Sequence, residues 1–336
     1  MFDPGFSKHS HGFRPGHRAH NAVVEAHGYI QDGRKWVVDV DLEQFFDRVN
    51  HDVLMGRLAK RIGDRRVLGL IRRYLGAGVM ANGVATERYE GTPQGGPLSP
   101  LLANVLLDEV DKELEKRGHA FCRYADDSNV YVRARRAGER VMGLLRRLYA
   151  GLRLRINEAK SAVDLAWNRK ILGYSFWVAK DSTVKLQVAN KALATMKDCV
   201  RAITARTGGR SIDQVCKRLG EYLRGWRAYF RLADTAWTFA NLDKWIRRRL
   251  RALHLKHWGQ QSTVYRELRA RGMSEDAASV VAVTCRRWWM NSARMMHVAF
   301  PIRYFDQLGV PRLATQPQLP EPPGADPHAG WCGRGP

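Results

Sequence analysis

Two adjacent carboxylates at the tip of a predicted hairpin constrain this chain more than any other feature. Phe121–Arg123 and Asn129–Arg133 have strand character, and Tyr124-Ala125-Asp126-Asp127 lies between them. Neighbouring carboxylates repel each other unless a cation lies between them, and Mg²⁺ is commonly held by one or two carboxylates together with substrate phosphates. The motif indicates a metal site, but Asp-Asp is also ordinary turn chemistry, so the interpretation depends on a third carboxylate.

A second segment supplies that third carboxylate. Trp36–Leu42 is a β-branched run whose alternation places Val38 and Val40 on one face and Asp39 and Asp41 on the other. A strand that ends in Asp beside an Asp-Asp hairpin is the minimal geometry for two ions roughly 3.5–4 Å apart, which clamp the attacking and leaving oxygens of a phosphoryl transfer. From the residues alone, the alternative that Asp39 and Asp41 simply face solvent stays open.

The overall charge favours a phosphate-bearing partner. The 336 residues include 56 Lys and Arg against 33 Asp and Glu, a net charge of +23, and nucleic acid is the usual partner of such a chain. The excess is concentrated from Lys191 to Phe300, where 22 basic and 8 acidic residues give +14. A basic membrane-surface protein is the competing interpretation, but no apolar run approaches the roughly 18 residues of a spanning helix. Because the start, Met1-Phe2-Asp3-Pro4, is unlike a signal peptide, we expect a soluble, cytoplasmic protein.

The cysteines point to no metal or disulfide framework. They are odd in number and widely spaced: Cys122, Cys199, Cys216, Cys285 and Cys332. We therefore expect reduced thiols. The end of the chain also lacks the clustered Cys or His of a metal-structured nuclease domain, and residues 314–336, rich in Pro and Gly, are expected to be a disordered tail.

Helical and strand patterns alternate in the first part of the chain. Helices are expected over Phe45–Leu58 and Asp64–Leu75, a strand over Thr86–Glu90, and a further helix after an N-cap at Ser99. The Gly-rich loop before this last helix can approach a ligand closely. Mixed elements continue to about Gln187 and only helices follow, which predicts an α+β body followed by an all-helical region.

Several segments occur in a fixed order along the chain. Six of them are His11–Gly16, Asp41–Asp47, Thr92–Pro100, Tyr124–Asp127, Gly151–Ser161 and Leu172–Tyr174. Two more, Leu223–Phe230 and Trp245–Leu250, follow in the helical region. Together they resemble the second to seventh blocks and the maturase, or thumb, region of bacterial-type group II intron-encoded reverse transcriptases, also called maturases. The resemblance covers about residues 5 to 313.

The resemblance implies a domain organisation. Residues 1–187 would form a reverse transcriptase domain with a right-hand polymerase palm and partial fingers, and residues 188–258 a helical thumb or maturase domain. Residues 259–313 would be a C-terminal basic helical region that could bind DNA, ahead of the tail. The chain starts almost at the second block, whereas the family carries an extension and a first block ahead of it, so we expect an N-terminally truncated member without a C-terminal nuclease domain.

The resemblance also implies roles for matching residues. Asp41, Asp126 and Asp127 would hold two Mg²⁺ ions that activate the primer 3′-hydroxyl and neutralise the triphosphate. The nucleotide-binding residues would be Arg14, Arg18, Phe46, Gln94 and Lys160. Among them, Phe46 would exclude a 2′-hydroxyl by shape and Arg14 would grip the triphosphate. His17-Arg18 stands where the family more often has Arg-Ser, and Arg18 would supply that charge one position on. Phe46 as a core aromatic and Gln94 as a loop-stabilising side chain remain alternatives.

The helical region carries a basic stripe of its own. Its members recur at three- and four-residue intervals: Lys244, Arg247, Arg248 and Arg251. A solvated charged face is the usual meaning of such a stripe. Here all four charges share one sign and repel unless an anion answers them, so we favour template or intron RNA as the ligand. Trp288 and Trp289 could likewise stack on bases, or pack in the core.

The sequence thus predicts an RNA-directed DNA polymerase of group II intron type, a mobile-element enzyme. Its partners would be an RNA template, a DNA primer and deoxynucleoside triphosphates. The resemblance also implies maturase activity, in which the protein binds its parent intron RNA and supports splicing. The alternative is a non-catalytic RNA-binding splicing cofactor, or an inactive fragment, because incomplete fingers could abolish polymerisation and leave the basic thumb intact.

Overall fold

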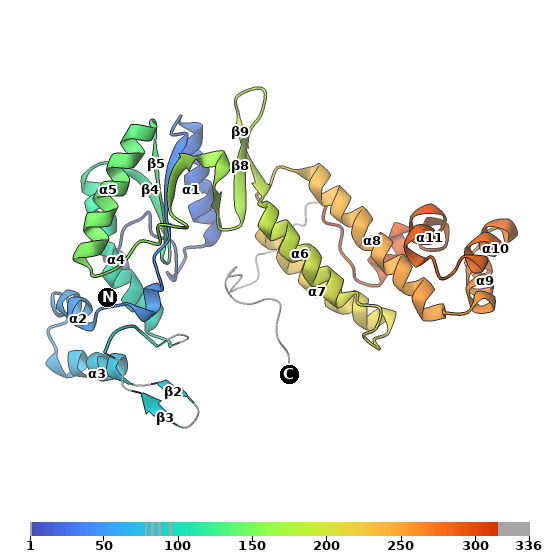
Figure 1. Cartoon of the computed structure of the whole chain (residues 1–336), viewed down its shortest axis with the longest axis horizontal. Coiled ribbons are helices and arrows are strands. Elements are labelled where there is room, and N and C mark those ends of the chain that lie inside the picture. Colours follow the sequence, from blue (N-terminus) through green and yellow to red (C-terminus); the bar gives the residue numbers. More distant parts are fainter. Residues whose placement is uncertain (1, 78, 82–83, 87–88, 94–95, 315–336) are drawn as a thin grey trace. The chain divides into compact units, whose positions relative to one another are not determined.

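The computed structural model describes residues 2–314 apart from 78, 82–83, 87–88 and 94–95 (Figure 1). The chain divides into two compact units, Met1–Lys185 and Leu186–Pro336. The first unit combines sheets with helices. Beyond strand β9 (Val184–Val188), the described elements of the second unit are helices. The predicted order of an α+β body followed by an all-helical region is confirmed, whereas the finer limits expected at residues 258 and 313 stay predictions.

A four-stranded antiparallel sheet in the order β4-β5-β1-β6 forms the centre of the first unit. Its strands are Ala120–Tyr124 (β4), Asp127–Val132 (β5), Trp36–Val40 (β1) and Ala162–Leu165 (β6). Strand β1 lies between β5 and β6, because Val38 pairs with Val130 on one side and with Val163 on the other. The expected hairpin and the expected Asp-bearing strand are therefore direct neighbours in one sheet.

Helices cover both faces of this sheet. Helices α4 (Ser99–Lys116) and α5 (Arg135–Gly151) share one buried cluster with Val38 and Val40, which confirms the apolar face predicted from the alternation. Helix α1 (Ala19–Gln31) lies against β4 and β5, where the rings of Tyr29 and Tyr131 are 5.8 Å apart. Side chains alternate between the two faces of a strand, and helices cover both faces of this sheet. Exposed polar side chains are therefore expected at the ends of the strands.

The remaining elements of the first unit are short. They are the 3₁₀ helices η1 (Asp3–Gly5), η2 (Phe45–Asp47) and η3 (Ala166–Asn168), the helices α2 (His51–Ala59) and α3 (Arg65–Gly76), and the strands β2 (Val79–Ala81), β3 (Val84–Thr86), β7 (Lys170–Ile171) and β8 (Tyr174–Val178). Strands β2 and β3 form a hairpin, and β7, β8 and β9 form a three-stranded sheet.

The single helix predicted over Phe45–Leu58 is wrong in its first half. The chain instead forms η2, which follows Gln44 in a left-handed conformation at φ 47°, and then starts α2 at His51. Asn50 is the N-cap of α2, and its side-chain oxygen accepts a hydrogen bond from Val53 N at 3.0 Å. An Asn in this position ends one helical segment and begins the next, since its side chain satisfies a first-turn N–H.

Two other boundaries differ from the predictions. Strand β3 ends at Thr86, where the predicted strand over Thr86–Glu90 was expected to begin, and residues 87 and 88 lie outside the described part. Ser99 is the first residue of α4 and not its N-cap; its hydroxyl donates to the Pro93 carbonyl at 2.7 Å. The hydroxyl thus ties the Gly-rich loop to the helix rather than capping it.

The second unit is a set of helices. They are α6 (Asn190–Ile203), α7 (Ile212–Tyr229), α8 (Ala236–Trp258), α9 (Gln261–Ala270), α10 (Glu275–Val283), α11 (Trp288–Arg294), α12 (Met296–Ala299) and α13 (Ile302–Gln307). No helix in the described part of the chain has the length and apolar character needed to cross a membrane. The predicted disordered tail and Cys332 lie outside the described residues, and the four other cysteines are buried.

Candidate active site

The β4–β5 hairpin places two carboxylates at the end of the central sheet. Its last pair joins Tyr124 to Asp127, so only Ala125 and Asp126 form the connection. Ala125 has a φ of 57°, and two-residue hairpins need a positive φ at a central position. A residue with a Cβ rarely adopts that conformation, so the surroundings of Ala125 must hold the turn in place.

The register of β1 against β5 brings Asp41 to the same place. Asp39 pairs with Asn129 and Val40 with Ser128, so Asp41 follows β1 at the end of the sheet where β5 begins with Asp127. The backbone at Asp41 is fixed from a third segment, since Asn157 N donates to the Asp41 carbonyl at 2.9 Å and Asp41 N donates to Ser161 Oγ at 3.0 Å.

Asp39 and Asp41 have different surroundings although they lie on the same strand face. Asp39 forms an ion pair with Arg169, with Nη2 and Oδ2 2.6 Å apart. Burial raises the pKa of Asp39, and the Arg169 guanidinium opposes that rise. Asp41 is 28% exposed, and its Oδ2 lies 3.3 Å from the Lys160 ammonium. Asp39 is therefore held in an ion pair within the fold, whereas Asp41 lies near the surface beside the exposed Lys160 side chain.

Asp126 and Asp127 lie at the tip of the hairpin, but the described residues form no complete metal site there. Among the described residues, no three His, Cys, Asp or Glu side chains are grouped closely enough to hold a metal ion. Like charges repel when no cation lies between them, and Lys160 supplies the positive charge beside Asp41 in this arrangement. The assignment of Asp41, Asp126 and Asp127 as metal ligands stays a prediction.

The residues expected to bind the nucleotide have varied surroundings. Phe46 is half-buried, with its ring 5.1 Å from that of Phe45, and packs against the palm core. Arg18 is exposed and precedes α1. Gln94 lies outside the described residues. Lys160 is 68% exposed beside Asp41.

Arg14 is held inside the first unit. Its Nε donates to Asp3 Oδ1 at 2.8 Å, its Nη1 to the carbonyls of Ser7 and Ser10, and its side chain is 6% exposed. Its guanidinium also lies over the Phe6 ring at 5.6 Å. A contact between Arg14 and a triphosphate would require it to exchange these partners, so this role too stays a prediction.

Arg123 stabilises the hairpin turn through hydrogen bonds of its buried side chain. The sequence did not predict this role. Its guanidinium is buried with Asp111 of α4, the two side chains each 1% exposed and 2.6 Å apart. Its Nη1 donates to the carbonyl of Ala125 at 2.7 Å, and its Nη2 donates to Ser10 Oγ at 2.7 Å. The available signal was an arginine in the middle of an apolar strand, because a buried charge requires a partner.

The segment His9–His11 forms backbone hydrogen bonds with Arg123, just before the same turn. Arg123 N donates to the His9 carbonyl at 2.9 Å, and His11 N donates to the Arg123 carbonyl at 2.8 Å. The next residue, Gly12, lies so close to Ala125 that a Cβ built on it would be 2.1 Å from the Ala125 nitrogen. Only glycine allows this approach without a shift of backbone.

A carboxylate on α1 binds both histidines of this segment. Glu25 is within hydrogen-bond reach of His9 Nδ1, of His11 Nε2 at 2.6 Å and of the Tyr29 hydroxyl at 2.8 Å. Burial alone would raise the pKa of Glu25, but the hydrogen bonds from His11, His9 and Tyr29 lower it to about 2. The charged form of Glu25 therefore ties α1 to the segment that supports the turn.

Most arginines in the basic stripe of α8 contact other groups of the second unit. Arg247 is 4% exposed and pairs with Asp243, with Nη1 and Oδ1 3.0 Å apart. The Arg248 guanidinium lies 4.0 Å from the Trp289 ring centre, and Arg251 donates to the Phe300 carbonyl at 3.0 and 2.9 Å. Burial lowers the pKa of Arg251. The fold itself supplies acceptors for three of the four charges, so their mutual repulsion does not by itself require an external anion.

A cavity of about 550 Å³ nevertheless opens along this stripe. Lys244, Arg247, Arg248 and Arg251 line it together with Arg312. Lys244 is exposed. Trp289 is 42% exposed and Trp288 is half-buried, with the guanidinium of Arg206 and the ammonium of Lys256 each 5.0 Å from the Trp288 ring centre. RNA binding by the stripe stays a prediction.

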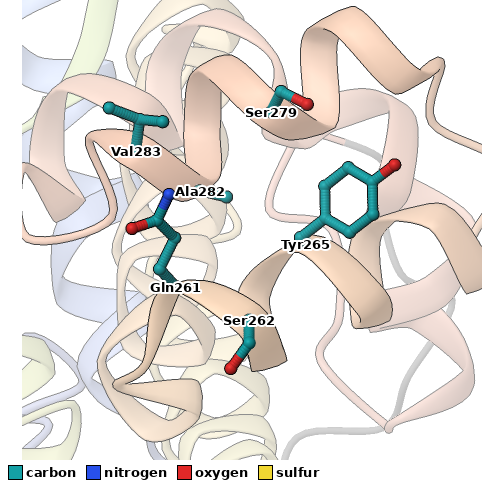
Figure 2. A pocket seen from close by; sticks show the side chains of 6 residues that line it. All are labelled: Gln261, Ser262, Tyr265, Ser279, Ala282 and Val283. Atoms are coloured by element: carbon teal, nitrogen blue, oxygen red, sulfur yellow. The ribbon is translucent and has the colours of Figure 1, made fainter.

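Another hollow lies between α9 and α10. It has a volume of about 520 Å³, and Figure 2 shows Gln261 reaching from α9 toward Ala282 and Val283 of α10. Its other lining residues are Ser262, Tyr265 and Ser279. No charged side chain of the described residues lines this hollow, so it offers no counter-charge to a phosphate.

Comparison with known proteins agrees with the fold and the motif order. Residues 2–176 match the family model described as reverse transcriptase (RNA-dependent DNA polymerase), and residues 193–272 match that of the group II intron maturase-specific domain. The chain belongs to the reverse transcriptase family, and its maturase-specific region places it with the group II intron-encoded members.

Two curated relatives illustrate this similarity. The group II intron-encoded protein LtrA of Lactococcus lactis subsp. cremoris is 40% identical over 112 residues, 33% of this chain and 18% of that protein. Protein YkfC of Escherichia coli strain K12 is 30% identical over 206 residues, 48% of this chain and 53% of that protein. The chain thus spans about half or less of these relatives.

Two solved structures are also similar to parts of this chain. Apo telomerase from Candida tropicalis aligns with 92% of this chain and 54% of its own, at 11% identity and a TM-score of 0.45. A chain of a partial Cas6-RT-Cas1–Cas2 complex is 30% identical, aligns with 41% of this chain and 26% of its own, and has a TM-score of 0.24.

Proposed function

We propose that this chain is an RNA-directed DNA polymerase of group II intron type, acting by two-metal nucleotidyl transfer on an RNA template and a DNA primer. The observation that supports the proposal is the register of β1 against β5, in which Val40 pairs with Ser128, so that Asp41 follows β1 at the end of the sheet where Asp126 and Asp127 stand. Membership of the reverse transcriptase family supports it. The register matters because it brings carboxylates from two distant sequence segments to one end of the sheet.

The residues at this end of the sheet suit Mg²⁺. They are carboxylates, the hard oxygen donors that Mg²⁺ prefers, and they stand on adjacent strands, where their mutual repulsion favours a cation. Asp41, Asp126 and Asp127 would hold the two ions. When bound, such ions lower the pKa of an attacking hydroxyl and stabilise the charge on the transferred phosphoryl group.

The neighbouring side chains would bind and select the nucleotide. Lys160 is exposed at 3.3 Å from Asp41, and an ammonium in that position can exchange a carboxylate for the oxygens of a triphosphate. Phe46 is half-buried where β1 leads into η2. A ring on that element would exclude a 2′-hydroxyl by shape, which selects deoxynucleotides.

The second unit would contribute binding of intron RNA and support of splicing. The match to the maturase-specific domain and the charge of +14 between Lys191 and Phe300 support this role. Exposed Lys244 and the cavity along α8 are the candidate contact region.

Primer extension tests the polymerase proposal. The full chain is supplied with an RNA template, a DNA primer, deoxynucleotides and Mg²⁺, and compared with the double variant Asp126→Asn, Asp127→Asn, which keeps the size of both side chains. Metal ions contribute several kcal/mol to phosphoryl transfer, so we expect extension to fall roughly a thousandfold. Equal extension by wild type and variant would refute the polymerase proposal, and tight binding of intron RNA in that case would favour a non-catalytic splicing cofactor.

A further inference from the structure

An arginine-lined cavity lies at the other end of the β4–β5 hairpin from the carboxylates. Its volume is about 510 Å³, and the residues around it come from the start of β4, the end of β5 and one side of α5. Five of them are arginines: Arg34, Arg117, Arg133, Arg140 and Arg147. Strands rise about 3.3 Å per residue, so the length of β5 puts this cavity roughly 17 Å from Asp127. It is therefore separate from the proposed polymerase site.

The base of the cavity consists of buried side chains of the first unit. Tyr131, Val132, Val141 and Leu144 line it and are buried in the first unit. His119 also lines the cavity. Burial lowers its pKa and the neighbouring Arg117 guanidinium lowers it further, so the charged form of this ring is disfavoured. The positive charge of the site consequently comes from guanidinium groups around an ordered apolar base.

The arginines of α5 divide according to whether they line this cavity. Arg135 pairs with Glu139 at 3.1 Å, and Arg146 forms two hydrogen bonds with Glu158 at 2.9 and 2.7 Å; neither lines the cavity. Arg140 and Arg147 do line it.

Among the described residues, none that lines the cavity carries a negative charge. Within the described part of the chain, neither Arg140, Arg147 nor Arg133 has a carboxylate within ion-pair distance, and no Asp or Glu lines the cavity. Arg34 and Arg117 have carboxylate partners outside it, Asp32 and Glu113. Like charges held together without an acid are unfavourable unless an anion is bound.

We propose that this cavity binds backbone phosphates of an RNA strand, at a second contact distinct from the polymerase centre. Guanidinium groups match phosphate oxygens bidentately, and exposed arginines around an open site suit a strand that passes through rather than an enclosed small molecule. Contacts of this kind fix the position of the RNA without reading its sequence. The proposal depends on neither polymerisation nor splicing.

Paired double variants of α5 test it. Arg140→Gln with Arg147→Gln removes two cavity charges, and Arg135→Gln with Arg146→Gln removes two charges from the same helix outside the cavity. Both variants change the net charge equally, so a general electrostatic effect cannot separate them. Circular dichroism and thermal unfolding of each variant verify that the fold is retained.

The measurement is the fluorescence anisotropy of a labelled, unstructured single-stranded RNA, titrated with full-length protein over a series of salt concentrations. Each lost phosphate contact makes the slope of log affinity against log salt shallower by about 0.7, so the cavity variant should differ by about 1.4 and bind roughly 25-fold more weakly at 0.1 M salt. The control pair should remain close to wild type. Equal slopes and affinities for the two double variants would overturn the proposal. Because the readout is binding, the result does not depend on whether the chain extends a primer.

Discussion

The two units of the molecule each bury an arginine–aspartate pair, but one pair joins a strand to a helix and the other lies within a single helix. In the first unit, Arg123 of β4 meets Asp111 of α4, and both side chains are 1% exposed. In the second unit, Arg247 meets Asp243 one turn earlier in the same helix, with 4% and 13% of the side chains exposed. The first pair holds a strand to a helix beneath the hairpin turn, whereas the second is held mainly by α8 itself.

The same contrast applies to clusters of like charge. The carboxylates at the hairpin come together through strand register, and Lys160 faces one of them from the surface. Along α8, the arginines come together through helical spacing. Arg247 pairs with Asp243, Arg248 lies over the Trp289 ring, and Arg251 donates to the Phe300 carbonyl. A run of like charge therefore indicates a ligand only where the fold does not supply the counter-charge.

Replacing Arg123 by Met should have the largest effect on stability. The change leaves Asp111 buried without its partner and removes the hydrogen bond to the Ala125 carbonyl, so we expect the free energy of unfolding to fall by about 3–5 kcal/mol. Urea unfolding measures the change. As a control, Arg135→Met removes an exposed pair and should cost less than about 1 kcal/mol. Similar losses for both variants would show that the buried pair does not hold the turn.

Replacing Arg247 by Met should have an intermediate effect. Asp243 would lose its ion pair but would still accept hydrogen bonds from Leu313 N at 3.0 Å and Ala314 N at 3.1 Å, so we expect a loss of about 2–3 kcal/mol. Lys244→Met, at an exposed position of the same stripe, should change stability by less than about 0.5 kcal/mol. If urea unfolding gave equal losses, Arg247 would belong with the surface charges after all.

Phe46 offers a functional comparison that rests on the proposed polymerase. Phe46→Ala should relax discrimination against ribonucleotides roughly tenfold to a hundredfold, because a shape contact of this kind contributes about 1–3 kcal/mol. The ratio of kcat/KM for a deoxynucleotide and the matching ribonucleotide measures it within one protein, so loss of stability cancels. Phe46→Tyr keeps the ring and should retain discrimination. An unchanged ratio in Phe46→Ala would remove Phe46 from the site.

The Glu25 cluster should give an effect that depends on pH and changes only at low pH. The pKa of Glu25 is lowered to about 2 from an ordinary value of 4.5. A lowered pKa stabilises the fold above the unfolded-state value, and that stabilisation is lost as the pH falls toward 2. The stability difference between wild type and Glu25→Gln should therefore shrink between about pH 4.5 and pH 2, as followed by urea unfolding. A difference that stays constant across this range would show that the charge of Glu25 is not what binds the histidine segment.

Much of the first unit could be predicted from local pattern. The period-2 alternation around Asp39 and the two strands around Asp126 are visible in the sequence because each strand has one buried face. The break between η2 and α2 was missed because it depends on Gln44 in a left-handed conformation and on the cap at Asn50. The role of Ser99 was missed because its acceptor, the Pro93 carbonyl, is presented by the fold of a loop.

The sequence by itself determined the α+β order of elements, the excess of basic charge and the motif order that places this chain in its family. These properties depend on neighbours along the chain, and periodicity and composition record them directly. The tertiary structure decided which charges have partners. Arg123 pairs with Asp111 and Asp39 pairs with Arg169. On α5, Arg135 and Arg146 pair with glutamates, whereas Arg140 and Arg147 line a cavity. Such pairings depend on distances between elements that are far apart in sequence, and these distances exist only once strand register and helix packing are set.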